Sequence, residues 1–140
     1  MIIADTGFWL ALANRRDRYH EIAKDALGGL SEPLVTTWPV MTETCHLLAA
    51  RLSVDAELRF VERAKAGAFE IFSVEQRHLA RVHQLMQKYR NLPMDLADAS
   101  LVLLAEELDS GRILSTDTRD FNAYRWKNRK PFRNLLASKL

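Results

Sequence analysis

Several residue types are scarce in this chain of 140 residues, and each scarcity excludes a class of structure. Cys45 is the only cysteine, so neither an intrachain disulfide nor a zinc site built from several thiolates can form. The longest charge-free run near the C-terminal half, residues 99–105, is far shorter than the roughly 20 apolar residues of a membrane-spanning helix. No Pro/Gly/Ser-rich linker and no repeat divides the sequence. We therefore expect a single domain over residues 1–140, in the cytoplasm and not in a membrane.

Net charge is also small, at +2, but it is unevenly distributed. Residues 112–140 carry eight Lys/Arg and two acidic residues, whereas the preceding part is slightly acidic. Such a basic segment can bind a polyanion; a solvated, poorly structured tail is the alternative. Arg119, Arg125 and Trp126 are its candidate contacts, because an aromatic ring between basic groups can stack on a base while they hold phosphates. For Trp126, packing against the body of the protein is the alternative.

The chain does contain short apolar runs that alternate with longer segments of helical periodicity. Strands are expected at residues 1–4, 33–37, 69–73 and 112–116, and helices at 8–14, 19–30, 39–52, 54–66, 75–89 and 93–108. Strands that alternate with helices of this length indicate βαβ units. The prediction is an α/β fold: a doubly wound, central parallel sheet with helices on both faces.

Two of the predicted strands end in the same kind of residues. Asp5 follows the first strand, and Asp117 follows the strand at 112–116. Ligands of such sheets bind outside the carboxyl ends of the strands, which makes both carboxylates candidates for one site. An aspartate at a strand-to-helix turn can instead serve only as a helix N-cap.

Two further carboxylates, Glu43 and Asp98, lie on helices at positions where the periodicity places apolar residues. Burial of a carboxylate costs several kcal/mol unless the group is paired, neutralised or bound to a metal. A structural salt bridge is the usual explanation, but no Arg or Lys lies within one helical turn of either residue. A partner from elsewhere in the fold must therefore neutralise them.

If these four acids converge, they cannot all stay ionised without a cation. Oxygen ligands of this kind suit the hard ions Mg²⁺ and Mn²⁺. Thr6, Ser115 and Thr116, which adjoin Asp5 and Asp117, could hold waters or orient a carboxylate. Asp95, in the first turn of a predicted helix, and Asp120, beside an arginine, have structural explanations and are left out of the predicted site.

Four segments resemble the PIN domain and, more narrowly, the VapC-type toxins of prokaryotic toxin–antitoxin pairs. They are residues 3–7, 40–43, 95–100 and 115–121, and the likeness extends along nearly the whole chain. The resemblance implies a three-layer α/β/α fold and Mg²⁺- or Mn²⁺-dependent cleavage of RNA. It also implies that Asp5, Glu43 and Asp98 are the core metal ligands and Asp117 a more peripheral one. The partners it implies are a small antitoxin and a second copy in a homodimer.

Three other functions remain open. A PIN-like fold could bind RNA or a protein without cutting. A phosphatase with an aspartyl nucleophile at Asp5 would need a second acid two residues later, where Gly7 stands. Cys45 and His46 could form a nucleophile pair, although the two are adjacent residues of a mostly apolar helix.

Overall fold

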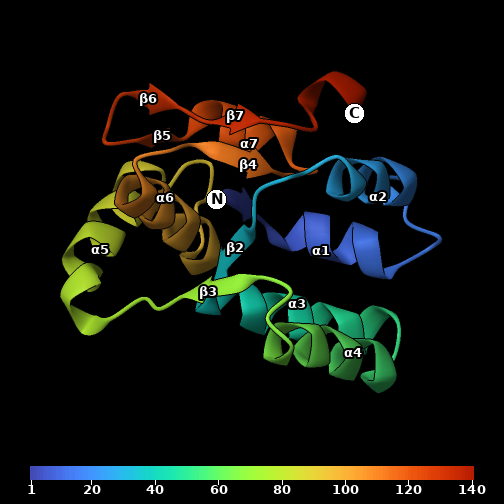
Figure 1. Cartoon of the computed structure of the whole chain (residues 1–140). Helices are drawn as coiled ribbons and strands as arrows, with labels where there is room; N and C mark the ends of the chain where they lie inside the picture. The colour runs from blue at the N-terminus through green and yellow to red at the C-terminus, as the bar shows by residue number, and fades with distance from the viewer.

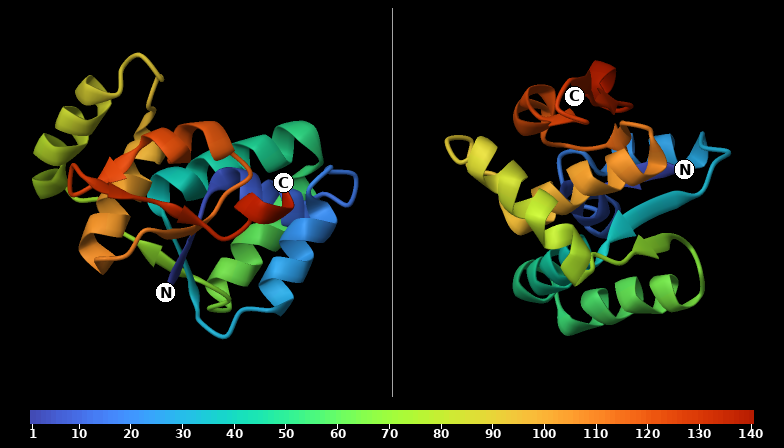
Figure 2. Two further views of the ribbon diagram at one scale, coloured as in Figure 1. Left: turned by 90° about the horizontal axis from the view of Figure 1, so that it is seen from above. Right: turned by 90° about the vertical axis from the view of Figure 1, so that its left-hand side faces the viewer.

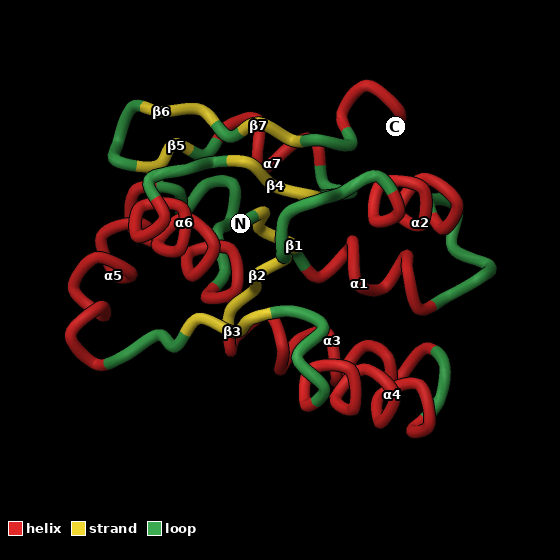
Figure 3. The backbone as a smooth tube through the Cα atoms, in the orientation of Figure 1, coloured by secondary structure: helices red, strands yellow, loops and turns green.

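The computed structural model describes all 140 residues, and its centre is a five-stranded sheet. The strand order is β3–β2–β1–β4–β7, and every neighbouring pair is parallel, as the sequence predicts. The strands are β1 (Ile2–Ala4), β2 (Leu34–Thr37), β3 (Glu70–Phe72), β4 (Arg112–Leu114) and β7 (Arg133–Asn134). The three strands nearest the middle are almost wholly buried, because helices cover both faces of the sheet (Figures 1 and 3).

The helices form the two outer layers of a three-layer α/β/α arrangement. Four of them lie on one side of the sheet, where α1 contacts α2 and α3, and α3 contacts α4. Helices α5 and α6 lie on the other side (Figure 1). The first group is α1 (Thr6–Ala13), α2 (His20–Gly28), α3 (Trp38–Arg51) and α4 (Val54–Lys65), and the second is α5 (Leu79–Lys88) and α6 (Leu96–Leu108). The predicted fold class is therefore confirmed. None of these helices is long and apolar enough to cross a lipid bilayer.

Helix α6 is buried more completely than its sequence pattern suggested. Helical periodicity alone indicates one buried face, but Ala97 and every residue from Ala99 to Ala105 are buried. The reason is that α6 contacts α5, α3, strands β1 and β2, and a C-terminal hairpin, so it has neighbours on all sides. A half-buried carboxylate on this helix, Asp98, therefore lies close to the core.

Two predicted helices begin later than expected. Residues 75–89 open with a 3-10 turn (Gln76–His78) before α5 starts. Helix α6 begins at Leu96 rather than at Pro93, because Asp95 is its N-cap and accepts a hydrogen bond from the Asp98 backbone N–H at 2.8 Å. The aspartate thus ends the preceding turn and fixes the first turn of the helix.

The basic C-terminal segment is folded, so the alternative of an unstructured tail is wrong. It contains α7 (Thr118–Ala123), the hairpin strands β5 (Arg125–Trp126) and β6 (Lys130–Pro131), the edge strand β7 and a final 3-10 turn (Ala137–Lys139). Figure 2 shows this segment, in red, running from the α5–α6 side of the molecule to the side of α1 and α2. Its β7 strand pairs with β4, and the Asn134 side-chain amide donates to the Ser115 carbonyl at 2.8 Å.

Candidate active site

One pocket of about 390 Å³ lies where β1 and β4 end and α1, α6 and α7 begin. Because β1 and β4 are parallel neighbours, the residues that follow them reach the same edge of the sheet, as predicted. The pocket brings together all four predicted acids and two others. The carboxylates that line it are Asp5, Glu43, Asp95, Asp98, Asp117 and Asp120.

Asp5 and Asp117 cap helices and also line the pocket, so the N-cap role does not exclude either residue from a site. Asp5 accepts from the Phe8 backbone N–H at 3.0 Å, and Asp117 accepts from the Asp120 N–H at 3.1 Å. Capping uses one oxygen of a carboxylate and leaves the other available. Asp5 is buried, with 6% of its surface exposed, whereas Asp117 is exposed and is the more peripheral acid.

Glu43 and Asp98 are held by hydroxyl groups rather than by basic residues. The Thr6 hydroxyl donates to Glu43 Oε1, and the Tyr124 hydroxyl donates to Asp98 Oδ2 at 3.1 Å. The ion pairs of the structure include neither of these acids, and they include neither Asp5 nor Asp117. The salt-bridge explanation therefore fails for Glu43 and Asp98.

Burial and mutual repulsion hold two of these carboxyl groups partly protonated near neutral pH. Burial raises the pKa of Asp5 from 3.8 to about 6, and the charges of Asp117 and Glu43 add to the rise, while hydrogen bonds from Ser115 and Phe8 oppose it. Burial, followed by the charge of Asp95, raises the pKa of Asp98 from 3.8 to about 7, against the hydrogen bond from Tyr124. Perturbation of this kind is typical of functional sites.

Asp95 and Asp120 were left out of the predicted site, yet both line the pocket. Asp120 lies 3.6 Å from the Arg119 guanidinium, which agrees with the expected pairing. Its Oδ1 is nevertheless buried without a hydrogen-bond partner, and burial raises its pKa. The sequence contained the signal, because both Asp95 and Asp117 are N-caps followed three residues later by a second aspartate. The N-cap residue and the third helical residue face the same first turn.

The three predicted supporting hydroxyls are all placed near the acids. Ser115 Oγ donates to Asp5 Oδ2 and accepts from the Asp117 backbone N–H at 2.9 Å, so it joins the two strand-end aspartates. Thr6 bonds Glu43, as described above. Thr116 lines the pocket, and its hydroxyl lies where a Cβ on Gly7 would be, so any side chain at position 7 would displace it.

Two arginines line the acidic pocket, and only one of them was predicted. Arg119, at the start of α7, is expected from the sequence and is 86% exposed at its side chain. Arg51 was missed; it is exposed, lines the same pocket and takes part in no ion pair. Glu43, Leu47 and Arg51 are spaced by four residues along α3 and all line the pocket. That spacing puts them on one face of the helix, which is the signal that could have identified Arg51.

The expectations for Trp126 and Arg125 need correction. Trp126 is only 6% exposed, its Nε1 donates to the Pro131 carbonyl at 3.1 Å, and its ring lies directly against Gly111. No open face remains on which a base could stack. The Arg125 guanidinium donates to the carbonyls of Asn122 and Tyr124 at 2.8 and 2.9 Å, and this residue does not line the pocket.

The other basic groups of the C-terminal hairpin also lie away from the pocket. Lys127 and Lys130 pair with Asp109 at 2.7 and 3.9 Å, and Asp109 is the C-cap of α6. The N-terminus of this 13-residue helix carries the site, and a helix of that length spans about 20 Å. Of the basic C-terminal residues, Arg119 therefore lies beside the acid cluster, whereas Lys127 and Lys130 do not.

The donor set of the pocket fits a hard divalent cation. All of its candidate ligands are carboxylate oxygens, two have pKa values raised into the range of 6 to 7, and the buried Oδ1 of Asp120 lacks a hydrogen-bond partner. These are the ligands that Mg²⁺ and Mn²⁺ prefer. As the side chains stand, no three His, Cys, Asp or Glu residues are arranged to hold one ion.

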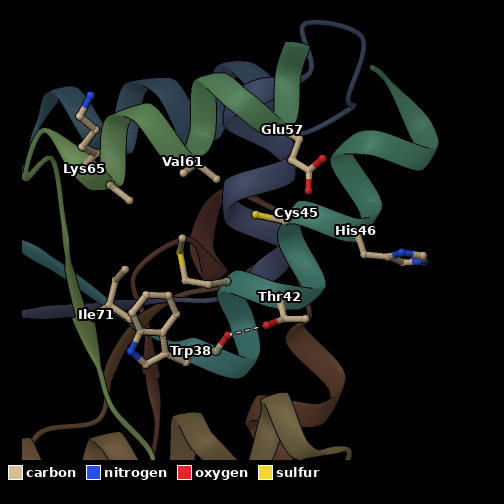
Figure 4. Close-up of a pocket in the computed structure, with 10 residues that line it drawn as sticks. Trp38, Thr42, Cys45, His46, Glu57, Val61, Lys65 and Ile71 are labelled. Carbon is tan, nitrogen blue, oxygen red and sulfur yellow. Dashed lines mark hydrogen bonds between the residues drawn. The ribbon is translucent and has the colours of Figure 1, made fainter. Parts of the chain in front are cut away.

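A second, larger hollow of about 690 Å³ lies between α3, α4 and β3, away from the acids. Figure 4 shows Cys45 and His46 on its α3 wall, with the sulfur and the imidazole pointing in opposite directions. Burial also raises the pKa of the Cys45 thiol, which disfavours a thiolate. The alternative of a Cys45–His46 nucleophile pair therefore has no support in the structure.

Comparisons with known proteins find a family model, a related sequence and a similar crystal structure. The family model described as PIN domain matches residues 2–127. A ribonuclease of Mycobacterium tuberculosis, VapC26, is 29% identical over 124 residues, which make up 89% of this chain and 92% of that protein. The crystal structure of M. tuberculosis VapC20, a toxin that cleaves the sarcin–ricin loop, matches with a TM-score of 0.79 at 19% identity, and the match covers 85% of this chain and 92% of VapC20. At that identity the structural likeness shows the fold alone.

Proposed function

Because the chain belongs to the PIN domain family, we propose that it is a metal-dependent endoribonuclease that hydrolyses phosphodiester bonds of RNA. The observation that carries the proposal is the pocket with six carboxylates, of which only Asp120 contacts a basic side chain. Such a group of acids is costly to a protein that does not bind a cation. The activity named for VapC26, a ribonuclease, supports the choice of substrate.

Asp5, Glu43 and Asp98 would hold Mg²⁺ or Mn²⁺, with Asp117 as a more peripheral fourth acid. Bound there, the ion would polarise the phosphoryl oxygen and lower the pKa of an attacking water. Asp120 adds negative charge beside Asp117. Thr6 and Ser115 restrain Glu43 and Asp5 through their hydrogen bonds, as partners of ligating carboxylates commonly do.

Arg51 and Arg119 would bind the phosphates that flank the scissile bond. They belong to α3 and α7 and line the same pocket, whose acids would repel RNA on their own. Cationic side chains that contact phosphates position a nucleic acid without reading its sequence. The pocket therefore combines attraction for the RNA backbone with a cation site for the chemical step.

Two protein partners are part of the proposed function, a small antitoxin and a second copy of this chain. The likeness to VapC26 and VapC20 supports a role as the toxin of a toxin–antitoxin pair, held inactive by a small antitoxin protein. A homodimer is the proposed active assembly, as the family resemblance implies.

The test is cleavage of a mixed, structured RNA by purified protein in the presence of EDTA, Mg²⁺ or Mn²⁺. We expect cutting only with a metal, and loss of cutting in Asp98→Asn, which removes a charge but hardly changes the side-chain volume. The matched control is Asp25→Asn, because Asp25 is an exposed acid of α2 that does not line the pocket. Cleavage that persists in EDTA or in Asp98→Asn would refute the proposed site.

A non-cleaving module that binds RNA or a protein on the same fold is the remaining alternative. Such a protein would retain RNA in a filter-binding assay and show no cleavage with either metal. Its Asp98→Asn variant would bind RNA as tightly as the wild type. The phosphatase alternative finds no second acid at position 7, where Gly7 accommodates Thr116.

A further inference from the structure

Tyr124 contacts one of the acids of the pocket, and no sequence motif indicated it. It is the residue that ends α7, its side chain is fully buried, and its hydroxyl donates to Asp98 Oδ2 at 3.1 Å. The two residues are 26 positions apart and belong to different helical segments. This contact therefore connects the segment after Asp117 and Asp120 to the helix that carries Asp98.

The Tyr124 ring is held in a fixed orientation by other aromatic rings. It packs edge-on against Tyr89, with centroids 5.1 Å apart, and against Phe121 at 5.3 Å. The hydroxyl lies on the axis about which a tyrosine ring flips, so ring flips do not move it. Tyr124 therefore presents a fixed hydrogen-bond donor to Asp98.

Asp98 has little else to orient its carboxylate. It forms no ion pair, and its own backbone N–H is already bound to Asp95. With Oδ2 bound to Tyr124, the Oδ1 atom is the oxygen left for another ligand. A carboxylate on a helix has several rotamers, and the tyrosine hydroxyl selects one of them.

On the basis of the proposed metal site, we infer that Tyr124 is a positioning residue, which holds Asp98 in the orientation that binds the divalent cation. It does not contact the substrate. Loss of such a hydrogen-bond partner behind a metal ligand typically lowers metal affinity about 10- to 100-fold.

The test compares Tyr124→Phe with Tyr89→Phe. Each change removes one hydroxyl from the same aromatic cluster, but the Tyr89 hydroxyl accepts from the Arg125 backbone N–H at 3.0 Å and touches no carboxylate. Mn²⁺ binding is measured without RNA, by calorimetry or by the electron paramagnetic resonance signal of free Mn²⁺. We expect wild type and Tyr89→Phe to bind alike and Tyr124→Phe to bind about 10- to 100-fold more weakly. RNA cleavage by Tyr124→Phe should recover as Mn²⁺ is raised to saturation.

Equal Mn²⁺ affinity of Tyr124→Phe and wild type would overturn the inference. So would an undiminished effect of Tyr124→Phe in an Asp98→Asn background, because the tyrosine would then act through another residue. Circular dichroism of each variant identifies a loss of fold. Failure of the wild type to bind Mn²⁺ would refute the metal site and the role of Tyr124 with it. Mn²⁺ binding without RNA cleavage would refute only the proposed ribonuclease.

Discussion

Replacement of Asp5 by Asn should stabilise the metal-free protein while it abolishes metal-dependent activity. Asp5 is 6% exposed and makes no ion pair, and its pKa is raised from 3.8 to about 6. At about 1.4 kcal/mol per pKa unit, ionised Asp5 destabilises the fold at pH 8 by up to about 3 kcal/mol. Asparagine has the same shape and can retain the hydrogen bond from Phe8 and exchange one with Ser115, so most of this penalty should disappear.

Because the pKa of Asp5 is raised in the folded state, this residue makes the stability of the protein depend on pH. A raised pKa means that the folded state binds more protons than the unfolded state between about pH 4 and pH 6, so stability falls as pH rises through that window. In Asp5→Asn this part of the fall should be missing, and the two proteins should converge near pH 4. Glu32, whose pKa the Arg112 guanidinium lowers to about 2, acts in the opposite sense and only below about pH 4.5.

The assay is urea unfolding in EDTA from pH 4 to pH 8, followed by circular dichroism, with Asp25→Asn as the control for loss of a surface charge. Addition of Mn²⁺ should stabilise wild type and not Asp5→Asn. An Asp5→Asn protein that is no more stable than wild type at pH 8, or a difference that does not shrink toward pH 4, would refute the reasoning.

Three further predictions concern the rest of the pocket and the hairpin. Gly7→Ala should push the Thr116 hydroxyl aside and lower cleavage at least about tenfold, with a change in unfolding free energy below about 1 kcal/mol; a fully active variant would contradict this. Arg51→Gln should weaken RNA binding, measured with Ca²⁺ in place of Mg²⁺, and reduce the slope of log affinity against log salt by about one; an unchanged slope would remove Arg51 from the RNA contacts. Trp126→Phe should lower the unfolding free energy by about 1–3 kcal/mol and leave RNA affinity unchanged, because the Trp126 indole is buried against Gly111. A loss of RNA binding by the folded variant would show that Trp126 contacts the RNA.

The fold class was predictable because its signals are local. Apolar runs of strand length alternate with helical periodicity, and such alternation specifies a parallel sheet covered on both faces. The start of a helix was harder to predict where an N-cap residue, and not the apolar periodicity, sets it. Helix α6 starts after Asp95 and not at Pro93, because the Asp95 side chain binds the Asp98 N–H.

The convergence of Asp5 and Asp117 was also predictable, since parallel neighbouring strands end at the same edge of a sheet. Glu43 and Asp98 were identified because they interrupt apolar helix positions without a basic residue nearby. Asp120 was left out because an arginine adjoins it, yet it both pairs with Arg119 and lines the pocket. Arg119 and Asp120 both belong to the first turn of α7.

What the sequence by itself determined, then, is the alternation of strands and helices up to β4, the parallel sheet, and four of the six acids at its edge, because the patterns that indicate each of these are local. Only the tertiary structure decided that Tyr124 bonds Asp98, that Arg51 shares a pocket with Arg119, and that Trp126 packs against Gly111 instead of facing solvent. Each of these joins residues that are distant in the chain. Their approach depends on how layers of helices pack across the sheet. A local pattern such as the spacing of Glu43 and Arg51 on α3 shows which residues share a helix face, but not what that face meets.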